Sequence, residues 1–198
     1  MSGQYQVTVV DKETITPEIY RLTLAAPAIA ASARPGQFVM LRTGSNPPPL
    51  LNRPFSVHWV TDDGHLGLLF KVVGEGTRRL ASLQPGDVLT AVGPLGQGFT
   101  WHNDNRPCLV GGGMGIAPLY MLARELLASG QQPSAIDLLL GARCRAEVAV
   151  LRDDFAALGL SPQIATDDGS LGHAGLVPEL LEALLYNPAG FTAAARDP

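Results

Sequence analysis

Short apolar runs separated by turn residues fill the first half of the chain. In the run "YRLTL", Leu22 and Leu24 alternate with polar residues, which is the two-residue period of a half-buried strand. The segment Asp62–Gly64 predicts a hairpin turn, because an Asp-Gly pair adopts positive φ at low cost. Strands at this spacing predict a small antiparallel barrel or a sandwich. The strand segments are "QYQVTVVDKETI", "IYRLTLAAP", "GQFVMLRT", the hairpin "FSVHWVTDDGHLGLLFKVV" and "DVLTAVGP".

After residue 101 the pattern changes to strands that alternate with helices. The segment "CLVGG" is a short apolar strand, and Pro118 begins a helix whose apolar residues from Leu119 to Leu126 recur at i, i+3, i+4 and i+7. Gly130 ends that helix. Strands at "AIDLLLGAR" and "SPQIATDD" and helices over Ala146–Leu158 and Gly175–Leu185 follow. This alternation predicts βαβ units around a parallel sheet. We therefore expect two domains, residues 1–101 and residues 102–198.

The composition is that of a globular protein without a nucleic-acid or membrane partner. Of the 198 residues, 46% are hydrophobic, and the formal net charge is −4 with lysine and arginine scattered along the chain. No apolar run reaches the ~18 residues of a membrane span, and the first residues lack the pattern of a signal peptide. The sequence therefore predicts a cytoplasmic protein.

Cysteine and histidine offer no candidate catalytic or metal site. Cys108 and Cys144 lie in different segments with no further ligand at metal-binding spacing, and we expect both to be buried thiols. None of the histidines neighbours a nucleophile in the sequence. They are His58, His65, His102 and His173. We expect no metal-ligating residue and no catalytic side chain.

A cluster of four glycines stands between the strand "CLVGG" and the helix that begins at Pro118. A strand that turns through glycines into a helix presents free N–H groups and the positive end of the helix dipole to a phosphate. The alternative is a glycine turn without a ligand. Gly113 and Gly115 fit the first two positions of the G-x-G-x-x-G fingerprint, but Pro118 stands at the third. The next strand ends in Gly141, Ala142 and Arg143, without the acidic residue that binds the ribose 2′-hydroxyl of NAD in such folds. The residues therefore do not decide between NAD and NADP.

Four motifs follow one another in the chain: "RPFS" (Arg53–Ser56), "VVGEGT" (Val72–Thr77), "GPLGQGF" (Gly93–Phe99) and "GGGMGIAP" (Gly111–Pro118). In this order they resemble the ferredoxin-NADP reductase superfamily. Within it the chain is most similar to the electron-transfer subunit of the NAD-dependent (type B) dihydroorotate dehydrogenase, from about Val7 to Leu185. The resemblance implies an FAD-binding β-barrel followed by a Rossmann-like parallel α/β domain that binds NAD(H).

The resemblance also implies roles for single residues. Arg53 would bind the FAD pyrophosphate, and Ser56 would contact the N5 and O4 edge of the flavin. Phe55 either packs on the flavin or faces the core, and Lys71 either lines the flavin or is a solvated strand residue. The loop at residues 166–170 either contacts the nucleotide or is a plain turn. The candidate cofactor-binding residues are Arg53, Pro54, Phe55, Ser56, Phe70, Lys71, Val72, Gly74, Gly76, Thr77, Gly111, Gly112, Gly113, Met114, Gly115, Pro118 and Asp168.

The sequence departs from the family after the nucleotide domain. The family carries a Cys-Gly-Pro strand there and four cysteines that hold a [2Fe–2S] cluster, and this chain has neither. Its last fifteen residues read as a tail, so the second domain is expected to be incomplete. The resemblance implies an electron-transfer role in pyrimidine biosynthesis beside a dihydroorotate dehydrogenase catalytic subunit, in a heterotetramer. The alternatives are another NAD(P)H-dependent flavin reductase subunit and a non-catalytic flavin-binding fragment.

Overall fold

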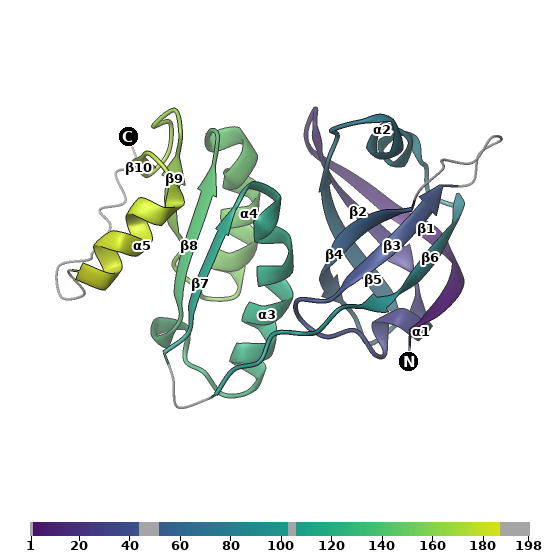
Figure 1. Ribbon diagram of the computed structural model, residues 1–198, viewed down its shortest axis with the longest axis horizontal. Helices are drawn as coiled ribbons and strands as arrows, with labels where there is room; N and C mark the ends of the chain where they lie inside the picture. Colours follow the sequence, from purple (N-terminus) through teal and green to yellow (C-terminus); the bar gives the residue numbers. More distant parts are fainter. Residues whose placement is uncertain (1, 44–51, 103–105, 187–198) are drawn as a thin grey trace. The chain divides into compact units, whose positions relative to one another are not determined.

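The computed structural model describes residues 2–43, 52–102 and 106–186, and most of the predicted tail lies outside these ranges. The chain folds into two compact units, one formed mainly by residues up to Thr100 and the other mainly by residues from Trp101 onward (Figure 1). No helix in the described ranges is long and apolar enough to cross a membrane.

The first unit is a closed barrel, which decides between the two predicted architectures. The strand order is β1-β2-β5-β4-β3-β6, every neighbouring pair is antiparallel, and β6 pairs with both β1 and β3. The strands are β1 (Gly3–Thr16), β2 (Ile19–Ala25), β3 (Phe38–Thr43), β4 (Arg53–Val60), β5 (His65–Lys71) and β6 (Val88–Leu95). Leu22 and Leu24 are fully buried in the barrel core, as their alternation predicts.

Two short helices that the sequence analysis did not predict connect the barrel strands. They are α1 (Pro27–Ala30), between β2 and β3, and α2 (Glu75–Ser82), between β5 and β6. The predicted strand ends at Lys71, and the residues after it turn into α2 through Gly74. Leu80 buries α2 against the barrel core, because it is only 2% exposed.

The Asp-Gly turn between β4 and β5 is confirmed. Gly64 has a φ of +89°, and the backbone N–H of Thr61 donates to the carbonyl of His65 at 3.0 Å. Gly64 is also packed closely, because a Cβ there would lie 2.7 Å from the Cβ of Pro27 at the start of α1. Positive φ and lack of space together require glycine at this position.

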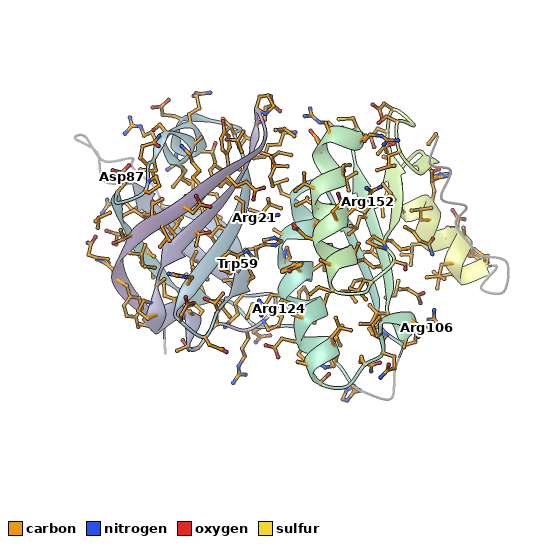
Figure 2. The ribbon with its side chains drawn as sticks, turned by 180° about the vertical axis from the view of Figure 1, so that it is seen from behind. Arg21, Trp59, Asp87, Arg106, Arg124 and Arg152 are labelled. Carbon is orange, nitrogen blue, oxygen red and sulfur yellow. The ribbon has the colours of Figure 1, made fainter. Side chains whose placement is uncertain are left out.

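Further along the same hairpin, Trp59 of β4 lies over Gly67 of β5. The two residues are directly paired across the strands, and a Cβ on Gly67 would overlap the indole ring. Trp59 is labelled in Figure 2. Covering an interior strand glycine with an aromatic ring compensates for the missing side chain.

The second unit contains a parallel sheet, as the strand–helix alternation predicts. Its order is β10-β9-β8-β7, with β7 (Cys108–Gly112), β8 (Asp137–Ala142), β9 (Gln163–Thr166) and the two-residue β10 (His173–Ala174). The helices are α3 (Ala117–Ala128), α4 (Arg145–Ala157) and α5 (Val177–Tyr186). Short 3-10 turns cover Gly113–Ile116 and Pro133–Ala135.

The helices cover the two faces of this sheet. Leu139 of β8 packs with Leu180 of α5, and a Cβ on Gly141 would lie 2.7 Å from the Cβ of Val177. Since side chains alternate along a strand, Leu138 and Leu140 point to the other face, where α3 and α4 lie (Figure 1). Both faces of β8 are thus buried, which explains its continuous apolar run.

The expectation that both cysteines are buried is wrong. Cys108 is exposed and Cys144 is intermediate. Cys108 begins β7, which has only β8 beside it among the described strands, and Cys144 stands just before the first residue of α4. Both thiols therefore lie at element ends, away from the middle of the sheet where small apolar residues are buried. Partial burial and the nearby Asp137 carboxylate raise the pKa of the Cys108 thiol.

We predict that Gly67→Ala lowers the thermal unfolding temperature of the barrel. Overlap of the new methyl group with the indole costs about 1–3 kcal/mol, the usual range for overpacking. The change is measured by thermal denaturation followed by circular dichroism. Trp59→Val combined with Gly67→Ala is the control, because removing the ring removes the overlap. An unfolding temperature that Gly67→Ala leaves unchanged would contradict this packing of Trp59 on Gly67.

Candidate functional site

Arg53, the first residue of β4, lies directly against the first turn of α2. A Cβ on Gly76 would lie 3.0 Å from both Cδ and Cζ of Arg53, and closer still to Nε. Only glycine therefore lets the arginine side chain occupy this place. The guanidinium and the N–H groups of a helix N-terminus are both phosphate ligands, and here they are adjacent. This cradle fits the pyrophosphate of FAD.

The hydroxyl of Thr77 shapes the turn that leads into α2. It accepts hydrogen bonds from the backbone N–H groups of Val73 at 2.9 Å and Gly74 at 3.1 Å, and it donates to the Gly74 carbonyl at 3.0 Å. Thr77 is 7% exposed. Its hydroxyl is thus committed to the protein, which leaves its backbone N–H as the group available to a ligand. Gly74 has extended backbone and open space around its Cβ position, so the chain itself does not demand glycine there.

The other end of α2 is held by Lys12 of β1. Its Nζ donates to the carbonyls of Ala81 and Leu83, each at 2.6 Å. A helix C-terminus carries unpaired carbonyls and partial negative charge, so an ammonium group stabilises it. Thr77 and Lys12 together fix α2, and with it the cradle beside Arg53. Sequence reasoning missed Lys12, because nothing local links residues 12 and 81.

The two candidate phenylalanines face the interior of the barrel. Phe55 is 8% exposed and Phe70 is 2% exposed; their rings meet edge to face with centroids 5.8 Å apart, and Phe70 also stacks on Tyr20 at 5.7 Å. Of the two alternatives for Phe55, the structure places it in the core.

The outward residues of the same strands differ in exposure. Pro54 is exposed, and Ser56 and Lys71 are half-buried. Val72, which follows β5, is half-buried and packs against the barrel core. The Nζ of Lys71 lies 3.5 Å from a carboxylate oxygen of Glu18, and the Val72 N–H donates to the Glu18 carbonyl at 2.7 Å. The β5 end is therefore tied to the turn between β1 and β2.

The glycine-rich loop divides its glycines between packing and open space. A Cβ on Gly111 would lie 2.7 Å from Cδ1 of Leu119, so this glycine lets the strand approach α3. Gly113 has a φ of +53°, which makes the turn. Gly115 is exposed with nothing within 4 Å of its Cβ position. The packing explains Gly111 and the turn explains Gly113, whereas Gly115 leaves room for a ligand beside the first turn of α3.

Other loop residues surround this opening. Gly112 is exposed, and its Cβ position lies 3.7 Å from Cγ1 of Val177. Met114 and Pro118 are half-buried, and Pro118 is the second residue of α3, where its missing N–H costs nothing. The strand–glycine–helix geometry fits a dinucleotide pyrophosphate.

The loop after β9 is organised by its own side chains. The carboxylate of Asp168 accepts hydrogen bonds from the Ser170 N–H at 3.0 Å and from the Ser170 hydroxyl at 2.6 Å, and these bonds lower the pKa of Asp168. The buried Thr166 hydroxyl bonds to both the N–H and the carbonyl of Leu171. These contacts account for a turn, and the contact of Asp168 with a nucleotide stays a prediction.

The residues described in the structure do not fit an iron–sulfur cluster. None of their histidine, cysteine and acidic side chains gather in threes as a metal site requires. The two cysteines lie on different elements, β7 and the start of α4. A [2Fe–2S] cluster needs four protein ligands, so no electron-transfer step is assigned to one in this part of the chain.

Comparison with known proteins agrees with this geometry. The oxidoreductase FAD-binding domain family matches residues 6–100. The electron transfer subunit of dihydroorotate dehydrogenase B (NAD(+)) from Geobacillus kaustophilus is 38% identical over 187 residues, which are 92% of this chain and 71% of the relative. The corresponding subunit from Desulforamulus reducens is 41% identical over 184 residues, which are 92% of this chain and 69% of the relative.

This chain belongs to the family of dihydroorotate dehydrogenase B electron transfer subunits, within the ferredoxin-NADP reductase superfamily. Among solved structures, an NADH-dependent reduced ferredoxin-NADP oxidoreductase is similar with a TM-score of 0.80 and 31% identity, over 91% of this chain and 63% of that one. A ferredoxin reductase of carbazole 1,9a-dioxygenase, at 22% identity and a TM-score of 0.79, shares the fold over 94% of this chain and 58% of its own. The predicted fold and family are thereby confirmed.

We predict that Lys12→Met weakens FAD binding about tenfold, because loss of hydrogen bonds from a charged group typically costs about 1.5–3 kcal/mol and part of that loss reaches the cradle. Fluorescence titration of the flavin-free protein with FAD measures the effect. Glu13→Gln is the matched control, since it removes the Arg21–Glu13 ion pair at the neighbouring position of β1 without touching α2. Equal FAD affinity in Lys12→Met and wild type would show that α2 needs no cap.

Proposed function

We propose that this chain is a flavoprotein electron-transfer subunit that binds FAD on its barrel and NAD(H) on its α/β unit, and passes electrons between them. The observation that carries the proposal is the placement of the Arg53 guanidinium against the first turn of α2, which only a glycine at position 76 permits. The relatives' NAD-dependent names and the match to the FAD-binding domain family support it.

The chain contributes binding and orientation to this reaction. Bound FAD supplies the redox chemistry, since it accepts a hydride equivalent from NADH. Arg53 and the backbone N–H groups of Gly76 and Thr77 would hold the FAD pyrophosphate, while Ser56 would orient the flavin edge. The open loop at Gly115 would hold the NAD(H) pyrophosphate at the start of α3. Hydride chemistry of this kind needs no proton from a side chain, so the residues of this chain would supply binding and orientation alone.

The electron acceptor that we propose is a dihydroorotate dehydrogenase catalytic subunit, which places the chain in pyrimidine biosynthesis. Support comes from the relatives, each of which is an electron transfer subunit of such an enzyme. We propose the cytoplasm as its compartment, because both cysteines are free thiols and disulfides are rare there. Mixing the purified chain with that catalytic subunit and measuring co-elution tests the partnership.

The function is tested by anaerobic addition of NADH to the FAD-loaded protein. We expect the flavin absorption to bleach and to return when a dye acceptor is added. Flavin reduction that is not specific to NADH would favour a different flavin reductase. A bound flavin that NADH does not reduce would favour a non-catalytic flavin-binding fragment.

Arg53→Ala is expected to lower FAD affinity at least tenfold, because a charge-assisted bond to phosphate is worth about 1.5–3 kcal/mol. The flavin-to-protein ratio after gel filtration measures the loss. Arg78→Ala is the control, since Arg78 also lies on α2 but points to solvent beside Glu75. Wild-type flavin content in Arg53→Ala would remove Arg53 from the site.

Gly115→Val should impair NAD(H) binding and leave the FAD content unchanged. The branched side chain fills the open space beside the loop and blocks close approach of a phosphate to the backbone. Calorimetric titration with NAD⁺ measures binding directly. Ala156→Val, at an exposed position of α4, is the control for a new branched side chain on a helix of this unit. Unchanged NAD⁺ affinity in Gly115→Val would make the loop purely structural.

A further inference from the structure

The end of β8 is the place where a nucleotide-binding unit of this kind tells NAD from NADP, and this inference rests on the proposed function. In such folds an acidic residue there binds the ribose 2′-hydroxyl, whereas a nearby arginine accommodates a 2′-phosphate. β8 ends at Ala142, and the next residue is Arg143. Taken alone, Arg143 favours NADP(H).

Arg143 forms an ion pair with Glu147, which lies in the first turn of α4. Nε of Arg143 donates to Oε1 of Glu147 at 2.8 Å, a terminal guanidinium nitrogen donates to the same oxygen, and the Arg143 backbone N–H donates to Oε2 at 3.3 Å. Both carboxylate oxygens of Glu147 thus bind the residue that follows β8. Arg143 stands before the first residue of α4, so the pair joins the end of β8 to the helix.

The burial of the Glu147 carboxylate makes the pair persistent. The Glu147 side chain is only 11% exposed, whereas that of Arg143 is 63% exposed. If the guanidinium left for another anion, a largely buried carboxylate would lose its charged donor, and removing the charged partner of such a group is strongly unfavourable. An ordinary surface ion pair has no such penalty.

The neighbouring charges add to the effect. Asp167 and Asp168 are attached to the end of β8, because their N–H groups donate to the carbonyls of Ala142 at 3.1 Å and Arg143 at 3.2 Å. Nε of Arg145 is committed to the Ser170 carbonyl at 3.1 Å. The charged residues at this strand end are therefore two arginines (Arg143 and Arg145) and three acidic residues (Glu147, Asp167 and Asp168). Their formal net charge is negative.

We infer that Glu147 is the residue that makes this site select NAD(H) and reject NADP(H). It neutralises the arginine that would otherwise pair with a 2′-phosphate, and it leaves that dianion facing an excess of carboxylates. A free ribose 2′-hydroxyl carries no charge and meets no such repulsion. Glu147 is therefore a specificity-determining residue that acts through Arg143.

The test measures binding of two adenosine nucleotides to the FAD-loaded protein by calorimetry. The probes are 5′-AMP and adenosine 2′,5′-bisphosphate, which differ only in the 2′-phosphate. We expect the wild type to prefer 5′-AMP. Glu147→Gln should tighten binding of the bisphosphate about tenfold, the value of one charge-assisted bond, and leave 5′-AMP binding unchanged. The ratio of flavin reduction rates with NADPH and NADH should shift in the same direction.

Three further variants make the outcome decisive. Arg143→Ala added to Glu147→Gln should abolish the gain, because the released arginine is its source. Asp153→Asn, which breaks the exposed Arg152–Asp153 pair on the same helix (Arg152 in Figure 2), should change neither affinity. Arg143→Ala alone should weaken the bisphosphate no more than 5′-AMP.

Two results would overturn the inference while the proposed function stands. One is an unchanged preference in Glu147→Gln when NADH still reduces the flavin. The other is a selective loss of bisphosphate binding in Arg143→Ala, which would make Arg143 a 2′-phosphate ligand in the wild type and decides the matter even if Glu147→Gln does not fold. A wild type that binds neither nucleotide and whose flavin NADH does not reduce would overturn the proposed function as well.

Discussion

The pairing of β6 with both β1 and β3 is the constraint on which the FAD-binding unit depends. It closes the barrel, so none of the six strands keeps an open edge, and alternate residues of every strand are directed to one interior. With the barrel closed, the end of β4 that carries Arg53 and the end of β5 that leads to α2 have fixed positions. Lys12 and Thr77 then fix α2 itself. The cradle that we propose for the FAD pyrophosphate is in this way a product of strand pairing between distant parts of the sequence.

The α/β unit builds the edge that we propose for NAD(H) binding by a different means. β8 is covered on both faces, and small residues near the carboxyl ends of β7 and β8 let helices pack closely: Gly111 beneath Leu119, and Gly141 beneath Val177. Because the helices pack closely on these strand ends, the polar groups of this edge lie in the loops that follow the strands. The polar groups beyond β8 and β9 are joined by backbone bonds from Asp167 and Asp168, so that the two loops form one charged surface.

The sequence contained most of the strands and helices because their apolar periods are regular. It could not choose between barrel and sandwich, since closure is decided by the two partners of β6, which lie far away along the chain. Helix α2 was missed because "GEGT" has the composition of a turn. The helix is stabilised by the Thr77 hydroxyl bonds, the Lys12 bonds and the burial of Leu80, none of which a local pattern shows.

Only part of the candidate site could be predicted, because its geometry also depends on contacts between residues that are distant along the chain. Arg53 and Gly76 are more than twenty residues apart in the sequence, yet they meet, and the motifs alone give no distance between them. Motif membership also did not separate the inward phenylalanines from the outward Ser56. Free cysteines are usually buried, but Cys108 is exposed because it is the first residue of β7.

The stacking of Trp59 on Gly67 links two positions that no motif contains. The space that a side chain would need at position 67 is already filled by the ring from position 59, so neither residue is free to change alone without overlap or a gap. A larger residue at position 67 is compatible with this barrel only beside a smaller residue at position 59. The hairpin therefore couples the two positions in a way that is independent of cofactor binding.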